Sequence, residues 1–266
     1  MRRLHRLVPL VVTALLAVAA FAASAATARA PESGGPSEYS LLQMNLCLSG
    51  LAGCYAGTEY PAVVDEAIEK ILATQPDAVT LNEACSGDVE RIARETGYDY
   101  RFDTVIYRGA PLPCRNPGDR GVFGIAVLTS DVIAGAESAP YEAQLGPEQR
   151  RLLCVRTGDD VRVCTSHLSV SGNPDEVATN DAQCEELSEA LAGDRRQATL
   201  FGGDVNRLSS CTPRGAWTEH DEEAVQAPGI QHVYGTRPGF VRPRDEVLPM
   251  TYSDHDALLV RALRLG

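Results

Sequence analysis

The sequence predicts an α/β fold in which helices are inserted among many short strands, and three observations carry this prediction. Short apolar or alternating runs bounded by turn residues recur along the chain, as expected of strands. A few longer segments repeat apolar residues at helical spacing. No glycine-rich nucleotide-binding loop follows the first strand, which argues against a dinucleotide-binding fold. The mixture favours a mixed sheet, or two stacked sheets with helices outside.

The helices are placed by apolar periodicity and by residues typical of helix ends. Proline is favoured at the first helical position, so Pro61 begins the first helix. Ser86 is expected to cap the second helix, and Gly97 to end it. The expected helices cover residues 61–74, 86–97 and 175–192.

The remaining apolar runs are expected to be strands. The expected strands cover residues 40–46, 77–83, 100–107, 122–129, 152–156, 161–166, 198–201, 230–234 and 257–260. Two of these runs flank Gly158 and Asp159, which is typical of a hairpin.

The N-terminus has the pattern of a secretory signal peptide. Three arginines precede an apolar stretch over 7–26, and a small-x-small cleavage site follows at 28–30. We therefore expect a cleaved signal peptide over 1–30, a flexible lead-in over 31–39 and one domain over 40–266, with the protein secreted to the extracellular space. An uncleaved membrane anchor is the alternative.

All eight cysteines lie beyond the expected leader, and an even count in an exported chain predicts disulfide bonds. No Cys-x-x-Cys pair is present, so a zinc site is disfavoured. The expected hairpin brings Cys154 and Cys164 together. The other pairs, suggested by neighbourhood, are Cys47–Cys54, Cys85–Cys114 and Cys184–Cys211.

The charge balance is strongly acidic. The formal net charge is −12, and removal of a leader with four arginines and no acid leaves −16. Such a chain does not hold nucleic acid by bulk charge, although local binding by arginines stays open.

Polar residues stand where the expected strands end. They are Asn45, Glu83, His167, Asp204, Asn206, Asp254 and His255. Strand ends meet at a common rim of a sheet, so we expect these side chains to converge. The two-residue spacing of Asp204 and Asn206 directs both to one face of an extended chain. The preceding pair, Gly202 and Gly203, is expected to allow a tight turn and to leave room for a substrate.

These residue types suit a specific chemistry. Carboxylate and amide oxygens favour Mg²⁺, Mn²⁺ or Ca²⁺ over zinc. Histidines bind phosphate or move a proton near neutral pH. Together they provide what attack of water on a phosphodiester requires: a neutralised phosphoryl oxygen, a deprotonated water and a protonated leaving group.

The order of the motifs resembles the endonuclease/exonuclease/phosphatase superfamily, with its deoxyribonuclease I-like fold. The motifs are "QMNLC", "VTLNEAC", "CTSHLSV", "LFGGDVNRL" and "YSDHDALLV". The resemblance implies an α/β fold, a four-layer α/β/β/α sandwich with two packed mixed β-sheets and helices on both outer faces.

The resemblance also implies roles for the site residues. Asn45 and Glu83 would bind the divalent metal, with Asp254 near it or orienting its neighbour. Asp204 would position or deprotonate the attacking water, or protonate the leaving group. Asn206 would orient the phosphate or that water.

The two histidines, His167 and His255, would contact the phosphate, with His255 a candidate general base. Members of the superfamily carry an aspartate that supports this last histidine, whereas Gln231 stands in its place here. His232, Asp245 or another acid would take the role, or His255 would work with a lower pKa, or activity would be reduced.

A second departure concerns phosphate contacts. Ile125 occupies a position where the superfamily usually has Tyr or Asn. Tyr107, Arg108 and Arg120 are candidates to supply the missing substrate contact, each with a surface or packing role as the alternative.

The resemblance favours a secreted Mg²⁺-dependent phosphodiesterase, with Mn²⁺ or Ca²⁺ as alternative ions. A nuclease acting on DNA or RNA is the default, and a monomer with no obligate protein partner is expected. A sphingomyelinase acting on a phospholipid headgroup, or an inositol-phosphate phosphatase, is the alternative enzyme. A non-catalytic binding or toxin-like module on the same scaffold is the second alternative.

Overall fold

The computed structural model of the protein describes residues 36–193, 197–237 and 239–265. The expected signal peptide lies outside the described residues. The first strand begins at Ser37, so residues 37–39 belong to a strand and not to a flexible lead-in. No helix in the described part of the chain is long and apolar enough to span a membrane.

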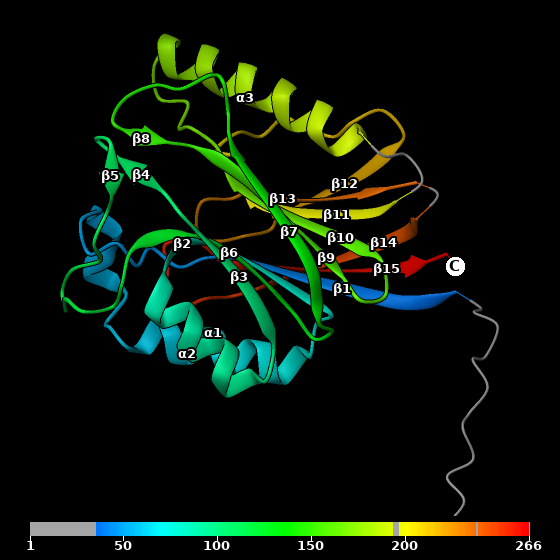
Figure 1. Cartoon of the computed structure of the whole chain (residues 1–266), viewed down its shortest axis with the longest axis horizontal. Coiled ribbons are helices and arrows are strands. Elements are labelled where there is room, and N and C mark those ends of the chain that lie inside the picture. The colour runs from blue at the N-terminus through cyan, green and yellow to red at the C-terminus, as the bar shows by residue number, and fades with distance from the viewer. Residues whose placement is uncertain (1–35, 194–196, 238, 266) are drawn as a thin grey trace, which may run out of the picture. The chain divides into compact units, whose positions relative to one another are not determined.

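The first sheet has six strands in the order β14-β15-β1-β2-β6-β3 (Figure 1). It is mixed, because β1 and β2 run parallel while the other neighbours run antiparallel. Its strands are β1 (Ser37–Asn45), β2 (Ala78–Cys85), β3 (Asp99–Thr104), β6 (Phe123–Thr129), β14 (Phe240–Leu248) and β15 (Ala257–Arg264).

The second sheet also has six strands, in the order β12-β13-β11-β10-β9-β7, and β10 and β11 are its parallel pair. Its strands are β7 (Ile133–Pro140), β9 (Arg151–Thr157), β10 (Val161–His167), β11 (Ala198–Asp204), β12 (Ala216–His220) and β13 (Gln231–Thr236). A small third sheet joins β4 (Ile106–Tyr107), β5 (Ala110–Pro111) and β8 (Glu148–Gln149).

Helices cover both outer faces. Helices α1 and α2 pack on the first sheet, and α3 packs on the second, with the two sheets face to face between them (Figure 1). The helices are α1 (Ala62–Thr74), α2 (Ser86–Thr96) and α3 (Pro174–Ala192), with a short 3₁₀ helix over Gly53–Gly57. The predicted four-layer α/β/β/α sandwich is confirmed.

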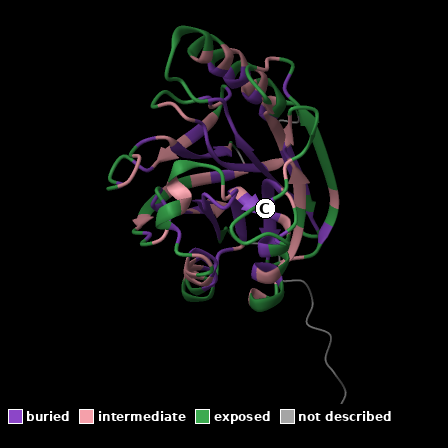
Figure 2. Cartoon of the chain, turned by 90° about the vertical axis from the view of Figure 1, so that its left-hand side faces the viewer, coloured by how far each residue is buried: buried purple, intermediate pink, exposed green. Residues whose placement is uncertain are grey.

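Three apolar cores hold the layers together. Leu41, Ile125, Val163 and Leu200 lie in the core between the sheets. The other two cores lie between each sheet and its helices. Figure 2 shows buried residues along the interior strands and exposed residues on the outward faces of the helices.

The glycine pair before the site has a packing role, which corrects the expectation of a tight turn. Both glycines lie inside strand β11. A Cβ atom on Gly202 would come within 2.3 Å of the Thr80 hydroxyl of the facing sheet. A Cβ atom on Gly203 would come within 2.3 Å of the Ser166 carbonyl oxygen. Glycine therefore leaves room for the facing sheet at position 202 and for the neighbouring strand β10 at position 203.

Two local expectations are also corrected. Ser86 is the first residue of α2 and does not cap it through its side chain, because its hydroxyl accepts a hydrogen bond from Val122 N instead. The charged segment 242–246, which is absent from the expected strands, lies inside edge strand β14.

All four predicted disulfide pairs are present. Cys154 and Cys164 stand opposite each other on β9 and β10, as the hairpin predicted. No free cysteine remains in the part of the chain that the structure describes. Four disulfides in one domain are typical of an oxidising, extracellular environment.

Candidate active site

The topology brings the predicted strand-end residues to one edge of the sandwich. In each sheet the two central strands run parallel, so their C-terminal ends lie side by side. His167 and Asp204 are direct register partners at the ends of β10 and β11. In the facing sheet, Asn45 ends β1 next to β2, which carries Glu83.

Asn45 links the two sheets at this edge. Its amide Nδ2 donates to Glu83 Oε1 at 3.1 Å and to Asp204 Oδ2 at 3.0 Å. Its Oδ1 accepts a hydrogen bond from Cys47 N at 3.2 Å, which fixes the orientation of the amide. The donor group therefore lies between two carboxylates.

Asp204 is the centre of the site. Its Oδ2 lies 3.8 Å from His167 Nε2 and 3.6 Å from His255 Nε2. The carboxylate and both imidazoles are buried, whereas Asp254 is exposed at the rim, with Oδ1 3.8 Å from His255 Nε2. One carboxylate is thus placed between two imidazoles.

Two site residues have left-handed backbone conformations. Glu83 has φ 52° and lies where the register between β2 and β6 shifts. Asn206 has φ 51°, its backbone N–H donates to Asp204 Oδ1, and its amide Nδ2 donates to Leu168 O. Such conformations cost free energy and persist only when surrounding contacts hold them. The bulge directs the Glu83 side chain towards the site.

Burial shapes the protonation of the site. It raises the pKa of Glu83 to about 7, with the nearby Asp204 carboxylate adding to the effect. Burial also raises the pKa of Asp204. Burial, with the positive charge of Arg150 and His255, holds the pKa of His167 well below its usual value. His167 is therefore neutral at physiological pH.

The donor chemistry fits a hard divalent cation. The cluster offers the carboxylate oxygens of Glu83, Asp204 and Asp254 beside the Asn45 amide. Magnesium in proteins is usually held by one or two carboxylates, with waters and substrate phosphate completing the octahedron. Glu83 would hold such an ion. Asn45, which the sequence predicted as a second ligand, directs its Nδ2 to the carboxylates and its Oδ1 to Cys47 N, so in this orientation it offers the ion no oxygen.

The sequence was then compared with known proteins. A model of the Endonuclease/Exonuclease/phosphatase family matches residues 53–255. The chain belongs to this family. The family name describes hydrolysis of phosphate esters, and its members generally depend on a divalent metal. A search of curated proteins gave no match.

Solved structures share the fold of this family member. An endonuclease/exonuclease/phosphatase from Beutenbergia cavernae is 19% identical, with TM-score 0.63, over 86% of this chain and 72% of that chain. The human Nocturnin catalytic domain with bound sulfate is 13% identical, with TM-score 0.63, over 85% and 93%. D. rerio TDP2 with a single-strand DNA product is 14% identical, with TM-score 0.59, over 85% and 99%.

One residue of the pocket at Asp204 was missed from the sequence. Arg150 precedes β9, lines the same pocket as Glu83 and Asp204, and donates to the His167 carbonyl oxygen at 3.4 Å. Its Nη1 lies 3.1 Å from Glu148 Oε1. The predicted hairpin could have indicated Arg150. In an antiparallel hairpin the start of β9 lies beside the end of β10, which carries His167.

Of the three predicted substrate-binding residues, the structure places one in the pocket. Tyr107 lines it. Arg108 is exposed at the turn after β4, outside the lining residues, with its guanidinium 5.5 Å from the centre of the Tyr107 ring. Ile125 points into the core between the sheets and does not reach the site.

Arg120 was wrongly assigned to the substrate. It is 5% exposed and forms an ion pair with Asp88 at 2.6 Å. Its other amino group donates to the carbonyl oxygens of Leu48 and Arg115, and the guanidinium lies 4.5 Å from the centre of the Tyr60 ring. These contacts use the whole guanidinium, so Arg120 clamps the loops behind the site.

Gln231, which replaces the usual aspartate of the family, is fully engaged elsewhere. Its Oε1 accepts a hydrogen bond from Gln43 Nε2 at 3.2 Å. Its Nε2 donates to the backbone carbonyl of Asp256 and, at 3.4 Å, to Asp221 Oδ2. The amide therefore joins the two sheets and does not orient a histidine.

No acid takes over the support of His255 among the described residues. His255 Nδ1 is buried without a hydrogen-bond partner. The ring nitrogens of His232 bind the Tyr234 hydroxyl and the Gly229 carbonyl, and Asp245 lies on edge strand β14. The two candidates named from the sequence are therefore wrong.

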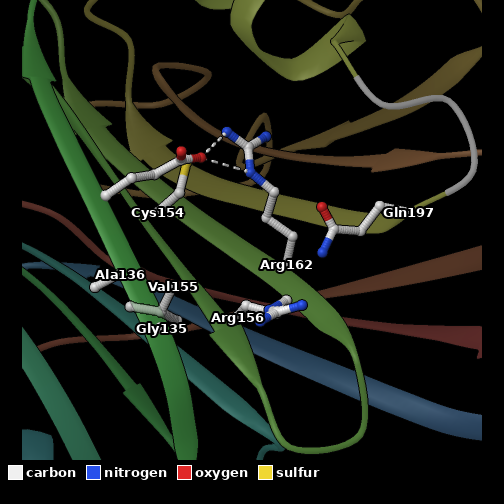
Figure 3. Close-up of a pocket in the computed structure, with 8 residues that line it drawn as sticks. Gly135, Ala136, Cys154, Val155, Arg156, Arg162 and Gln197 are labelled. Atoms are coloured by element: carbon white, nitrogen blue, oxygen red, sulfur yellow. Dashed lines mark hydrogen bonds and ion pairs between the residues drawn. The ribbon is translucent and has the colours of Figure 1, made fainter.

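A separate cavity of about 220 Å³ lies on the outer face of the second sheet (Figure 3). It shares no lining residue with the pocket at Asp204. Arg162 lines this cavity, and its Nη2 lies 2.7 Å from Glu137 Oε1, an ion pair that neutralises the guanidinium. We assign this cavity no part in the family's chemistry.

Proposed function

We propose that the protein is a divalent-metal-dependent phosphodiester hydrolase. The observation that supports this most strongly is Asp204, which lies within 4 Å of two imidazoles and shares the Asn45 amide with Glu83. A proton-transfer group beside a cluster of oxygen ligands provides what hydrolysis of a P–O bond requires.

In this proposal each side chain has a separate task. His255 is the general base, and Asp204 orients the attacking water and the imidazole that takes its proton. The neutral His167 and the Asn206 amide donate hydrogen bonds to the non-bridging phosphate oxygens. Glu83, with Asp254 near it, would hold a Mg²⁺ ion, which would neutralise charge at the phosphoryl oxygen, while the Asn45 amide positions the Glu83 and Asp204 carboxylates.

Nucleic acid is the proposed substrate class. The family name includes endonucleases and exonucleases, and the similar D. rerio protein was solved with a single-strand DNA product. A sphingomyelinase or inositol-phosphate phosphatase remains the alternative enzyme. A non-catalytic module is the second alternative, and the unpartnered Nδ1 of His255 is the observation that favours it.

We further propose that the protein is secreted as a monomer. The leader over 1–30 would be removed, leaving a short lead-in and one domain that ends at residue 266. The four disulfides support export, because such bonds persist in oxidising compartments.

One assay tests the function. The purified protein is incubated with single-stranded DNA, sphingomyelin or bis-p-nitrophenyl phosphate, with Mg²⁺ or with EDTA. We expect Mg²⁺-dependent cleavage of DNA and of the small diester. Asp204→Asn, which keeps the shape and removes the charge, should lower turnover by about 100-fold or more. Inertness towards all three substrates would reject the enzyme. Cleavage of sphingomyelin alone would reject the nuclease.

A further inference from the structure

The catalytic residues open into a pocket with one apolar wall. The pocket has a volume of about 510 Å³, and its lining includes Glu83, His167, Asp204 and His255. The wall, which we call the apolar wall, consists of Leu51, Tyr107, Leu112, Phe123 and Val170. Its residues come from loops, from the small sheet and, for Phe123, from the start of β6.

The part of the wall that carries Leu51 is held in place. The disulfide Cys47–Cys54 closes its loop, and Ser49 O in that loop accepts a hydrogen bond from Arg115 N at 3.0 Å. Leu51 N donates to the Ser49 hydroxyl at 3.1 Å. Leu51 is nevertheless 50% exposed, so this apolar side chain faces the pocket without a protein partner that covers it.

The pocket lining carries little positive charge. Arg150 is the only lysine or arginine among its lining residues, and it already pairs with Glu148. The remaining charged side chains of the lining, apart from the histidines, are acidic. Such a pocket neutralises one phosphate at the catalytic residues and offers nothing for a second.

We propose that the apolar wall binds a flat, uncharged ring attached to the reacting phosphate, such as a nucleobase at a chain end or in a short single strand. This inference rests on the proposed function and narrows it. Aromatic and aliphatic side chains give a base a contact surface without reading its sequence. A duplex held through many backbone phosphates does not fit a pocket with a single paired arginine.

The first test measures binding and needs no turnover. Calorimetry with Mg²⁺ present compares thymidine 5′-monophosphate, phenyl phosphate and methyl phosphate, which share the phosphate and differ in the ring. We expect the two ring-bearing ligands to bind at least about tenfold more tightly than methyl phosphate. Equal affinities would overturn the inference, while hydrolysis of bis-p-nitrophenyl phosphate would still support the proposed function.

A matched pair of variants tests whether the ligand's ring binds at the apolar wall. Leu51→Ala removes part of the wall, and Leu72→Ala removes an equally exposed leucine (51% against 50%) on α1. We expect Leu51→Ala to weaken binding of thymidine 5′-monophosphate about three- to tenfold and to leave methyl phosphate unchanged. Leu72→Ala should change neither. Identical behaviour of both variants would overturn the assignment to the wall.

The salt dependence of KM tests whether the pocket neutralises only one phosphate of the substrate. With one phosphate neutralised, log KM for short oligothymidylates should rise with log salt concentration at a slope of about 0.7, independent of length. A slope of about 2 or more that increases with length would show an extended backbone track and contradict the inference.

Discussion

Glu83 connects protonation to metal binding. Its pKa of about 7 means that a proton competes with the cation for the carboxylate around neutral pH. Because the folded-state pKa is raised, the ligand form is lost as pH falls through 7. We expect the Kd for Mn²⁺, measured by electron paramagnetic resonance, to rise about tenfold between about pH 8 and about pH 6.

The control for this prediction is Glu83→Gln. The amide should bind Mn²⁺ more weakly at all pH values and with a shallower dependence near pH 7. A wild-type Kd that stays constant over this range would show that Glu83 is not a ligand.

Gln231 raises the question of whether the family aspartate can be restored. In Gln231→Asp, the new carboxylate would lose the donor to the Asp256 carbonyl and would face Asp221, which is fully buried. Burial raises the pKa of Asp221 to about 6, so this site tolerates no further negative charge. We expect a loss of about 2–4 kcal/mol in the free energy of unfolding by urea, with no gain in turnover. A stable, faster variant would show that the aspartate reaches His255.

At the scale of elements, the disulfides Cys184–Cys211 and Cys47–Cys54 are expected to differ in their effects on stability and on metal binding. Cys184–Cys211 closes a longer loop than Cys47–Cys54, with sequence separations of 27 and 7. Loop entropy then predicts stabilisation of about 3.5 against about 2.4 kcal/mol. However, both sulfurs of Cys47–Cys54 lie within 4.8 Å of a Glu83 carboxylate oxygen.

Replacing both cysteines of one bridge by serine should therefore rank the two bridges differently for stability and for metal binding. Removal of Cys184–Cys211 should lower the melting temperature more, whereas removal of Cys47–Cys54 should weaken Mn²⁺ binding more. Calorimetry and metal titration on the same samples measure both quantities. Equal metal affinities in the two variants would show that the Cys47–Cys54 bridge does not position Glu83.

Most strands that the sequence predicted are buried, and the half-buried edge strand β3 is the exception. Central strands such as β2 and β6 are mainly apolar and were found nearly in full. The missed strands β7, β12 and β14 are all at sheet edges. An edge strand such as β14 is largely exposed and contains Pro243 next to a register shift, so it has no apolar pattern.

The site was predictable for a related reason. Polar residues after apolar strands mark the rim, and the seven predicted from chain order all lie there. Arg150 precedes its strand and becomes visible only through the hairpin register. Arg120 was misplaced because nothing in the sequence shows that Asp88 neutralises it.

For the molecule as a whole, a buried polar network holds the two sheets in register below the site. Asn82 Oδ1 accepts hydrogen bonds from Asp204 N at 2.7 Å and from Gln43 Nε2 at 2.8 Å, and its Nδ2 donates to Thr165 at 3.2 Å. Glu83 follows directly on the same strand. The distance between the metal ligands and the proton-transfer groups therefore depends on this network.

Asn82→Ala tests that dependence. It leaves the buried Asp204 N–H without this acceptor and Gln43 Nε2 with Gln231 Oε1 alone, so we expect a loss of about 2–4 kcal/mol in the free energy of unfolding by urea. Turnover of bis-p-nitrophenyl phosphate per folded molecule should also fall, because Asp204 loses its backbone anchor. Unchanged turnover in a destabilised protein would limit the network to a structural role.

The central claim is that side chains from both sheets surround one cation and one reacting phosphate. A crystal grown with Mn²⁺ and thymidine 5′-monophosphate tests it most directly, through anomalous diffraction from the metal. The account predicts an anomalous peak for Mn²⁺ at bonding distance from the Glu83 carboxylate. It also predicts that the phosphate lies between that ion and the side chains of Asp204, His167 and His255. A metal bound away from Glu83, or a phosphate that does not contact the histidines, would contradict it.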